Sequence, residues 1–260
     1  MTRITADTRS TTKPIDESYA DIVARLAGAQ KKRAAGAPAY SIYVNRKAGR
    51  YLAAGAYKAG LTPNMVTGIS AVFTFSGIAM LILLPIEWWS GVAVWLALAI
   101  GYALDSADGQ VARLRGGGSA SGEWLDHVVD SAKTSTLHLA VLITAFRSFD
   151  LPDVSLLLIP IGYCIVGAVS FFAMILNDQL KQAYGYPTST AEGKSTPLRA
   201  LLVIPTDYGF LCLTFLLLGA PYVFFAVYTL MFIANAGHLF LASIKWFRDM
   251  SKLDDARVSA

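Results

Sequence analysis

The sequence predicts an all-α fold, a polytopic membrane protein with six transmembrane helices and an amphipathic juxtamembrane helix before them. Three observations lead to this prediction. Of the 260 residues, 55% are hydrophobic and only 15% are charged, and the mean hydropathy is +0.48, unlike an ordinary soluble domain. Six apolar runs each approach the ~20 residues that a bilayer-spanning helix needs. The basic residues gather in alternate connections between these runs, as in proteins that cross a membrane repeatedly.

The N-terminal tail, residues 1–38, is expected to be cytoplasmic and partly disordered. Residues 1–15 show no periodicity, and Asp16 to Ala35 has the composition of a short surface helix. From Tyr40 to Ala59, basic residues alternate with aromatic and aliphatic ones, which is typical of an amphipathic helix in the membrane interface. We therefore expect a membrane domain over residues 39–248 and a cytoplasmic C-terminal tail over residues 249–260.

The predicted spans are set by the apolar runs, and their orientation is set by Lys and Arg. Basic residues lie before the first run, between the second and third, between the fourth and fifth, and at or after the end of the sixth, whereas only Arg147 lies on the other side. This asymmetry places both termini and the segment 105–130 in the cytoplasm, with the protein in the plasma membrane. It also accounts for the net charge of +4, so nucleic-acid binding is not expected. The spans are Met65–Pro85, Ser90–Asp108, Asp126–Phe146, Val154–Leu176, Ala200–Leu218 and Pro221–Trp246.

Four aspartates flank the connection between the second and third spans. Asp105 and Asp108 are three residues apart, and Asp126 and Asp130 are four apart, so each pair shares one face of a helix. The glycine-rich linker between them can turn sharply, which is expected to bring the four acids together. Acids beside the hydrocarbon are costly and are therefore functional candidates. Clustered carboxylates repel one another, and divalent cations, which prefer oxygen ligands, neutralise this repulsion. The sequence therefore predicts a metal site.

Small residues and a cation accompany these acids. Gly109 and Ala112 leave room for a bulky group beside the backbone, and the planar guanidinium of Arg113 suits a phosphate. Together with the acids, they indicate a pyrophosphate-bearing substrate on a two-metal site. The plainer interpretation is a charged loop in which the acids pair with Arg113, Arg115 and Lys133. Lys133 itself is either a simple counter-ion or a residue that tunes Asp130 through its charge.

The spacing of these residues resembles a family motif. The pattern D-x2-D-G-x2-A-R-x8-G-x3-D-x3-D is similar to that of the CDP-alcohol phosphotransferase family, also called CDP-alcohol phosphatidyltransferases, and the resemblance covers roughly Tyr40 to Trp246. The fixed positions are met by Asp105, Asp108, Gly109, Ala112, Arg113, Gly122, Asp126 and Asp130.

The resemblance implies an enzyme of phospholipid biosynthesis that depends on Mg²⁺ or Mn²⁺. It would move a phosphatidyl or other phosphoalcohol group from a CDP-alcohol, first of all CDP-diacylglycerol, to an acceptor hydroxyl and release CMP. A homodimer embedded in membrane lipid is also implied. The resemblance assigns metal binding to Asp105, Asp108 and Asp126, the general base and a further metal contact to Asp130, and the nucleotide pocket to Asn64, Thr67, Gly109, Ala112, Arg113 and Gly122.

The acceptor side is less defined. Lys181, Lys194 and Arg199 precede the fifth span on the metal side and are candidates for an anionic acceptor, although positive-inside charge explains them equally well. Asp207 interrupts an apolar run and is expected to line a polar cavity. Family members that use inositol phosphate carry an E-R-x-x-R type element near this point, where this chain has Ser195-Thr-Pro-Leu-Arg199. That departure weakens the case for inositol phosphate and leaves glycerol 3-phosphate, another polyol phosphate or a CDP-polyol donor as alternatives.

A transporter of divalent cations or organic anions is the alternative from another class. It would place its acids near the bilayer midplane, at the interface of internal repeats. The four acids here map to the predicted cytoplasmic ends of spans, and the chain shows no internal repeat. The enzyme is therefore favoured over the transporter.

Overall fold

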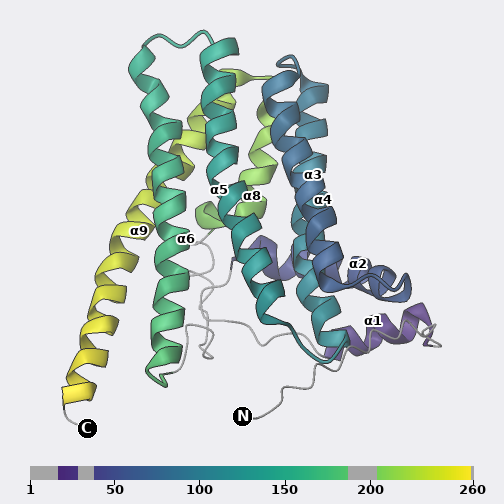
Figure 1. Ribbon diagram of the computed structural model, residues 1–260. Coiled ribbons are helices and arrows are strands. Elements are labelled where there is room, and N and C mark those ends of the chain that lie inside the picture. Colours follow the sequence, from purple (N-terminus) through teal and green to yellow (C-terminus); the bar gives the residue numbers. More distant parts are fainter. Residues whose placement is uncertain (1–16, 29–37, 187–203, 259–260) are drawn as a thin grey trace.

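The computed structural model describes residues 17–28, 38–186 and 204–258, and every regular element in these ranges is helical. The predicted all-α polytopic fold is confirmed. Residues 1–15, predicted to be disordered, lie outside the described ranges, and the domain boundaries at residues 38 and 248 stay a prediction. The helices, labelled in Figure 1, are α1 (Tyr19–Gly28), α2 (Arg46–Lys58), α3 (Pro63–Leu83), α4 (Trp88–Leu114), α5 (Ala120–Ser148), α6 (Leu158–Ala183), α8 (Tyr208–Thr214) and α9 (Pro221–Val258).

Short helical turns complete these elements. A π-helical turn, Ser41–Asn45, leads into α2, and a 3₁₀ turn, Val154–Leu157, leads into α6. Two more 3₁₀ turns, Ile204–Thr206 and Phe215–Leu217, flank α8. The region predicted to be an amphipathic helix from Tyr40 to Ala59 is therefore helical almost throughout.

Within the described ranges, four helical segments are long and apolar enough to cross a membrane: Pro63–Leu83, Trp88–Leu114, Val154–Ala183 and Pro221–Leu253. Helix α5 has 29 residues and a length of about 43 Å, which exceeds the ~30 Å hydrocarbon core, but its acids and Lys133 reduce its apolar content. The described part of the fifth predicted span is the short apolar helix Tyr208–Leu217, which covers about 15 Å. The count of six spans therefore stays a prediction.

The helices extend beyond the predicted spans at the acidic end. Helix α4 continues to Leu114, and α5 already begins at Ala120 because the Ser119 side chain caps it by accepting a hydrogen bond from the Gly122 N–H. The reversal between them uses Gly116 and Gly117, whose φ angles of 93° and 137° favour glycine. As a result, Asp105 lies about two and a half turns inside α4 rather than at the helix end.

Two buried apolar clusters hold the bundle together. The larger joins α3, α4, α5, α6, α8 and α9, with Leu98, Phe215 and Tyr228 fully buried. The smaller joins α1 and α2 to α3 and α4, and it contains Ile22 and Leu26 of α1. In Figure 1, α1 lies at the same end of the bundle as the reversal between α4 and α5 and the last turns of α9.

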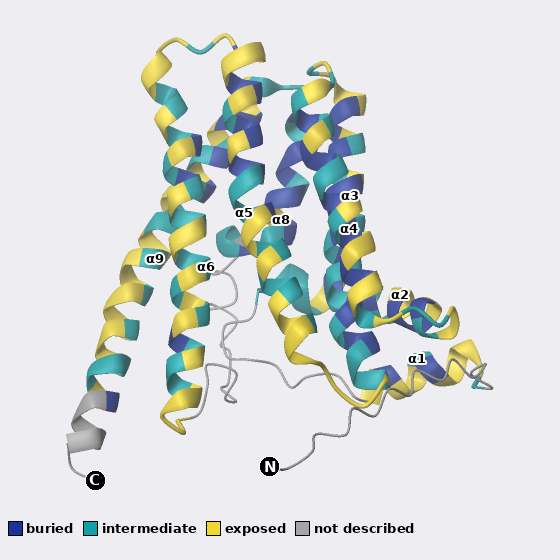
Figure 2. Cartoon of the chain, viewed as in Figure 1, coloured by how far each residue is buried: buried dark blue, intermediate teal, exposed yellow. Residues whose placement is uncertain are grey.

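Helices α3 and α4 approach each other closely at a glycine. The Ser70 hydroxyl donates to the Gly101 carbonyl at 2.8 Å, and a Cβ at Gly101 would lie 2.2 Å from the Thr74 hydroxyl oxygen. This contact fixes α4 just before Asp105. By contrast, Figure 2 shows mainly exposed and intermediate residues on the described lower parts of α6 and α9. Only 11% and 22% of the residues in the most apolar stretches of these two helices are buried.

Candidate active site

Three aspartates from two helices meet at one point. Each of Asp105 on α4 and Asp126 and Asp130 on α5 offers a carboxylate oxygen, and the three oxygens all lie within 4.8 Å of one another. We call these residues the acidic trio. All three are half-buried, and their hard oxygen donors fit Mg²⁺ or Mn²⁺. The sequence predicted a meeting of all four acids, from the spacing within each pair and the sharp turn of the glycine-rich linker, and three of them meet here.

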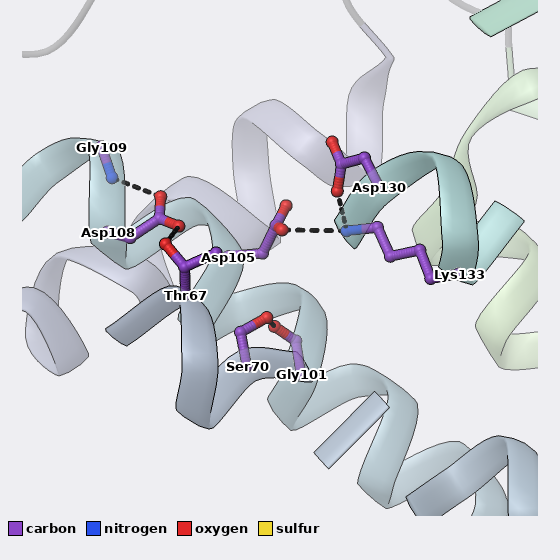
Figure 3. Close-up of polar contacts among 8 residues, drawn as sticks. All are labelled: Thr67, Ser70, Gly101, Asp105, Asp108, Gly109, Asp130 and Lys133. Atoms are coloured by element: carbon purple, nitrogen blue, oxygen red, sulfur yellow. Dashed lines mark hydrogen bonds and ion pairs between the residues drawn. The ribbon is translucent and has the colours of Figure 1, made fainter. Parts of the chain in front are cut away.

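Asp108 is oriented differently from the trio. Its Oδ2 accepts a hydrogen bond from the Thr67 hydroxyl of α3 at 2.6 Å, and its Oδ1 accepts one from the Gly109 N–H at 2.5 Å (Figure 3). The side chain is buried and lines the pocket described below. The structure thus brings three of the four predicted acids together and holds the fourth against α3.

Lys133 lies between two members of the trio. Its Nζ is 2.9 Å from Asp105 Oδ1 and 2.5 Å from Asp130 Oδ1, and Figure 3 marks both contacts with dashed lines. Among the described residues, neither Arg113 nor Arg115 forms an ion pair with the acids, so the charged-loop interpretation holds for Lys133 alone.

Beside the trio lies a cavity of about 1010 Å³, at the upper end of the usual size for a small-molecule site. We call it the polar pocket. It contains all six residues predicted to bind the nucleotide, together with Asp108 and Asp126. It is lined by Thr62, Pro63, Asn64, Thr67, Asp108, Gly109, Ala112, Arg113, Arg115, Gly117, Gly118, Ser119, Ala120, Gly122, Glu123, Asp126 and His127.

Glycines give the pocket its width and closure. A Cβ at Gly109 would meet only the Arg113 side chain, at 3.8 Å, so this wall stays open to a ligand. A Cβ at Gly122 would lie 3.0 Å from Asn64 Oδ1 and 3.1 Å from Ser119 Oγ. Gly122 therefore allows the start of α5 to approach the start of α3.

The two arginines of the reversal have different roles. Arg115 donates to the carbonyls of Gly60 and Leu61 at 2.9 and 3.0 Å, and its guanidinium lies 5.6 Å from the Tyr57 ring centroid. It therefore fastens the α2–α3 connection to the end of α4. Arg113 is half-buried, and its Nε has no hydrogen-bond partner within the described part of the chain, so it can offer donors to a phosphate in the pocket.

Two cap residues that were not among the predicted site residues also line the pocket. Thr62 caps α3 by accepting from the Met65 N–H, and Ser119 caps α5. The signal was available, since Thr62-Pro63 and Ser119 are typical helix starts. Because helix N-termini carry partial positive charge, two of them at one pocket favour an anionic ligand.

The acceptor candidates lie in different surroundings. Lys181 of α6 pairs with Asp249 of α9 at 2.8 Å. Asp207 is buried, and its oxygens accept from the backbone N–H groups of Ser41 at 3.2 Å and Gly209 at 3.0 Å. Asp207 therefore caps α8 and ties it to the segment before α2. The other two candidates, Lys194 and Arg199, lie outside the described residues.

The fold and site define a class: an integral membrane enzyme whose acids lie beside a polar pocket near one end of a helical bundle. The model of the CDP-alcohol phosphatidyltransferase family matches residues 60–240. The chain belongs to this family of CDP-alcohol phosphotransferases, as the motif indicated.

Two relatives agree with this assignment. The phosphatidylinositol phosphate synthase of Corynebacterium glutamicum is 37% identical over 98 residues, which cover 37% of this chain and 42% of that protein. The match thus spans less than half of that relative. The crystal structure of Mycobacterium tuberculosis phosphatidylinositol phosphate synthase in complex with manganese and citrate has a TM-score of 0.50 and 20% identity, covering 75% of this chain and 87% of that one. At this identity, the likeness concerns the fold.

Proposed function

We propose that the protein transfers a phosphatidyl group from CDP-diacylglycerol to the hydroxyl of a phosphorylated polyol and releases CMP, in a reaction that depends on a divalent metal. The observation that carries this proposal is the acidic trio beside the polar pocket, with Asp126 belonging to both. An anion-accepting pocket next to clustered carboxylates suits a nucleotide diphosphate whose charge is shared with metal ions.

Each group of residues has a task in the proposed reaction. The polar pocket holds the cytidine nucleotide, with Gly109 and Ala112 leaving room for it and Arg113 donating to its phosphates. Asp105, Asp126 and Asp130, together with Asp108, would hold two Mg²⁺ or Mn²⁺ ions. These ions would neutralise the diphosphate charge.

The transfer step follows from these positions. Asp130 accepts the proton of the acceptor hydroxyl, and the acceptor oxygen forms a bond with the β-phosphorus of the donor. The bond from the β-phosphorus to the bridging oxygen breaks, and CMP leaves with that electron pair. Asp130 suits this role because its carboxylate belongs to the acidic trio, next to the pocket residue Asp126, and a carboxylate held there can take a proton from the acceptor hydroxyl.

The acceptor is proposed to be a polyol phosphate because both relatives are named for a phosphatidylinositol phosphate product. Inositol phosphate and glycerol 3-phosphate are the two leading candidates, and Arg199 is proposed to contribute to acceptor binding with Lys181, Lys194 and Asp207. A CDP-polyol donor is the alternative. The site is proposed to face the cytoplasm from the plasma membrane, because the basic residues favour that orientation. A homodimer is proposed on the family resemblance alone.

The test is a CMP-release assay with purified protein, CDP-diacylglycerol, Mn²⁺ and separate acceptors: inositol 1-phosphate, glycerol 3-phosphate, inositol and no acceptor. We expect release with one phosphorylated polyol and none with Asp130→Asn. The matched control is Asp150→Asn, which makes the same change at an exposed residue just beyond the far end of α5 and should keep wild-type activity.

Other outcomes of this assay contradict the proposal in distinct ways. An intact donor with every acceptor removes CDP-diacylglycerol as the substrate, and a second assay with CDP-glycerol then tests the CDP-polyol alternative. Equal CMP release by Asp130→Asn and wild type removes the proposed general base. Mn²⁺ flux into proteoliposomes without any CMP release would support the transporter instead.

A further inference from the structure

Lys133 is a buried cation that joins two helices. Only 8% of its side chain is exposed, and its Nζ contacts Asp105 on α4 and Asp130 on α5. A buried ammonium is costly unless it is paired. Its pairing with Asp130 is a local contact, three residues apart, but its hydrogen bond to Asp105 crosses 28 positions of sequence. Lys133 therefore does more than neutralise its own helix.

A third helix completes the surroundings of the ammonium group. The Nζ lies 5.6 Å from the centroid of the Tyr208 ring on α8, within the range of a cation–π contact. Tyr208 is itself held in place, since Tyr102 of α4 packs edge-on against it at 5.1 Å and Asp207 caps the start of its helix. The position of Lys133 is thus set by α4, α5 and α8 together.

The partners of Lys133 are also members of the acidic trio. Asp105 and Asp130 each offer an oxygen to the candidate metal position, and each also pairs with Lys133. Three carboxylates converge there with one ammonium group. Like charges at such distances repel strongly where water is limited, so some cation is needed to keep the trio together.

We propose that Lys133 is a positioning residue: it holds Asp105 and Asp130 together in the metal-free protein, and a divalent cation binding to the trio takes over this task and competes with the lysine for the two carboxylates. This inference rests on the proposed function, because it takes the trio as the metal site. It differs from a purely structural ion pair in one measurable way, namely that Lys133 and the metal oppose each other.

The test compares wild type with Lys133→Met in the purified, full-length protein. The variant keeps most of the side-chain volume and removes the charge. Binding of Mn²⁺ is measured by electron paramagnetic resonance of the free ion, and the melting temperature is measured in EDTA and in Mn²⁺. We expect the Mn²⁺ Kd to fall by about tenfold, because a competing positive charge has gone. The melting temperature should drop in EDTA, and Mn²⁺ should restore most of the loss.

Lys181→Met is the matched control. It removes a second Lys–Asp pair, which is half-buried between α6 and α9, and neither partner is in the trio. A structural ion pair of this kind should lower the melting temperature equally in EDTA and Mn²⁺ and leave the Mn²⁺ Kd unchanged. If Lys133→Met behaves like this control, or binds Mn²⁺ more weakly than wild type, the proposed competition is wrong.

Lys133→Arg covers the case in which the neutral variant does not fold under either condition. Arginine keeps the charge, so its Mn²⁺ Kd should equal or exceed the wild-type value, and a Kd at least threefold lower would overturn the inference. Failure of the proposed function is distinguishable. Wild-type protein that binds no Mn²⁺ overturns the metal site itself, whereas a wild-type site that binds Mn²⁺ as tightly as Lys133→Met overturns only the role of the lysine.

Discussion

Removal of the Thr67 hydroxyl is the sharpest test of how the fold prepares Asp108. The Thr67 Oγ lies 2.6 Å from Asp108 Oδ2 and 3.1 Å from the Pro63 carbonyl oxygen. A hydroxyl has one proton to donate, and the shorter contact to a carboxylate is the stronger of the two. Both side chains are buried, with 3% and 8% of each residue exposed. Thr67→Val therefore leaves a buried carboxylate oxygen without its donor.

The magnitude follows from the kind of bond that is lost. A hydrogen bond to a charged group contributes about 1.5–3 kcal/mol. If the whole loss falls on the transition state, kcat/KM for the CDP-alcohol decreases by about 10- to 150-fold. If part of it falls on folding, the melting temperature decreases instead. Both quantities are measured for Thr67→Val, with CMP release as the activity readout.

Two variants separate the hydroxyl from the shape of the side chain. Thr67→Ser keeps the donor and should stay close to wild type. Thr136→Val makes the same substitution on α5, where the hydroxyl donates only to backbone carbonyls of its own helix. Neither its activation free energy nor its free energy of unfolding should change by more than about 0.5 kcal/mol. The reasoning is refuted if Thr67→Val matches Thr67→Ser in both kcat/KM and melting temperature.

Three more outcomes are expected. Gly122→Ala should raise the KM for the donor severalfold, since its Cβ would lie 3.0 Å from Asn64 Oδ1. Gly68→Ala, whose Cβ would have nothing within 4 Å, should leave the KM unchanged. Equal KM values for the two variants would contradict the close approach of α5 to α3. Leu26→Asp should lower the stability measured in thermal melts by about 2–5 kcal/mol, because Leu26 is 1% exposed. Ala24→Asp, at an exposed position, should lower it little. Equal melting temperatures for the two variants would show that α1 does not pack against α2, α3 and α4. Stripping the protein with EDTA should abolish CMP release and Mn²⁺ should restore it, and full activity in EDTA would refute metal dependence.

Local periodicity was enough to predict much of this architecture. The apolar runs located the four helices that are long and apolar enough to span a membrane, because burial in lipid requires an unbroken apolar segment. Helical spacing likewise predicted that Asp126 and Asp130 share a face, which depends only on neighbours within two turns of the chain. The glycine-rich linker predicted that Asp105 meets them, because a sharp reversal returns the chain beside itself.

Contacts between distant segments could not be predicted in the same way. Asp108 turns toward Thr67, 41 positions away, and Arg115 turns toward carbonyls 54 and 55 positions away. Which rotamer such side chains adopt depends on how the helices pack, and periodicity contains no information on that. The docking of α1 lies between these cases, since Ile22 and Leu26 are four residues apart and could have been recognised as one buried stripe.

The count of carboxylate oxygens shows which of the four acids depend on Lys133. One oxygen of Asp105 and one of Asp130 face the lysine, while both oxygens of Asp108 already accept hydrogen bonds from Thr67 and Gly109. In the proposed reaction, Asp130 must also take a proton, which removes its charge. Loss of that charge weakens its hold on Lys133 and leaves Asp105 as the remaining strong partner of the ammonium. Lys133 thus keeps a partner within the trio when Asp130 takes its proton, and the divalent ions that compete with it would supply the rest of the positive charge.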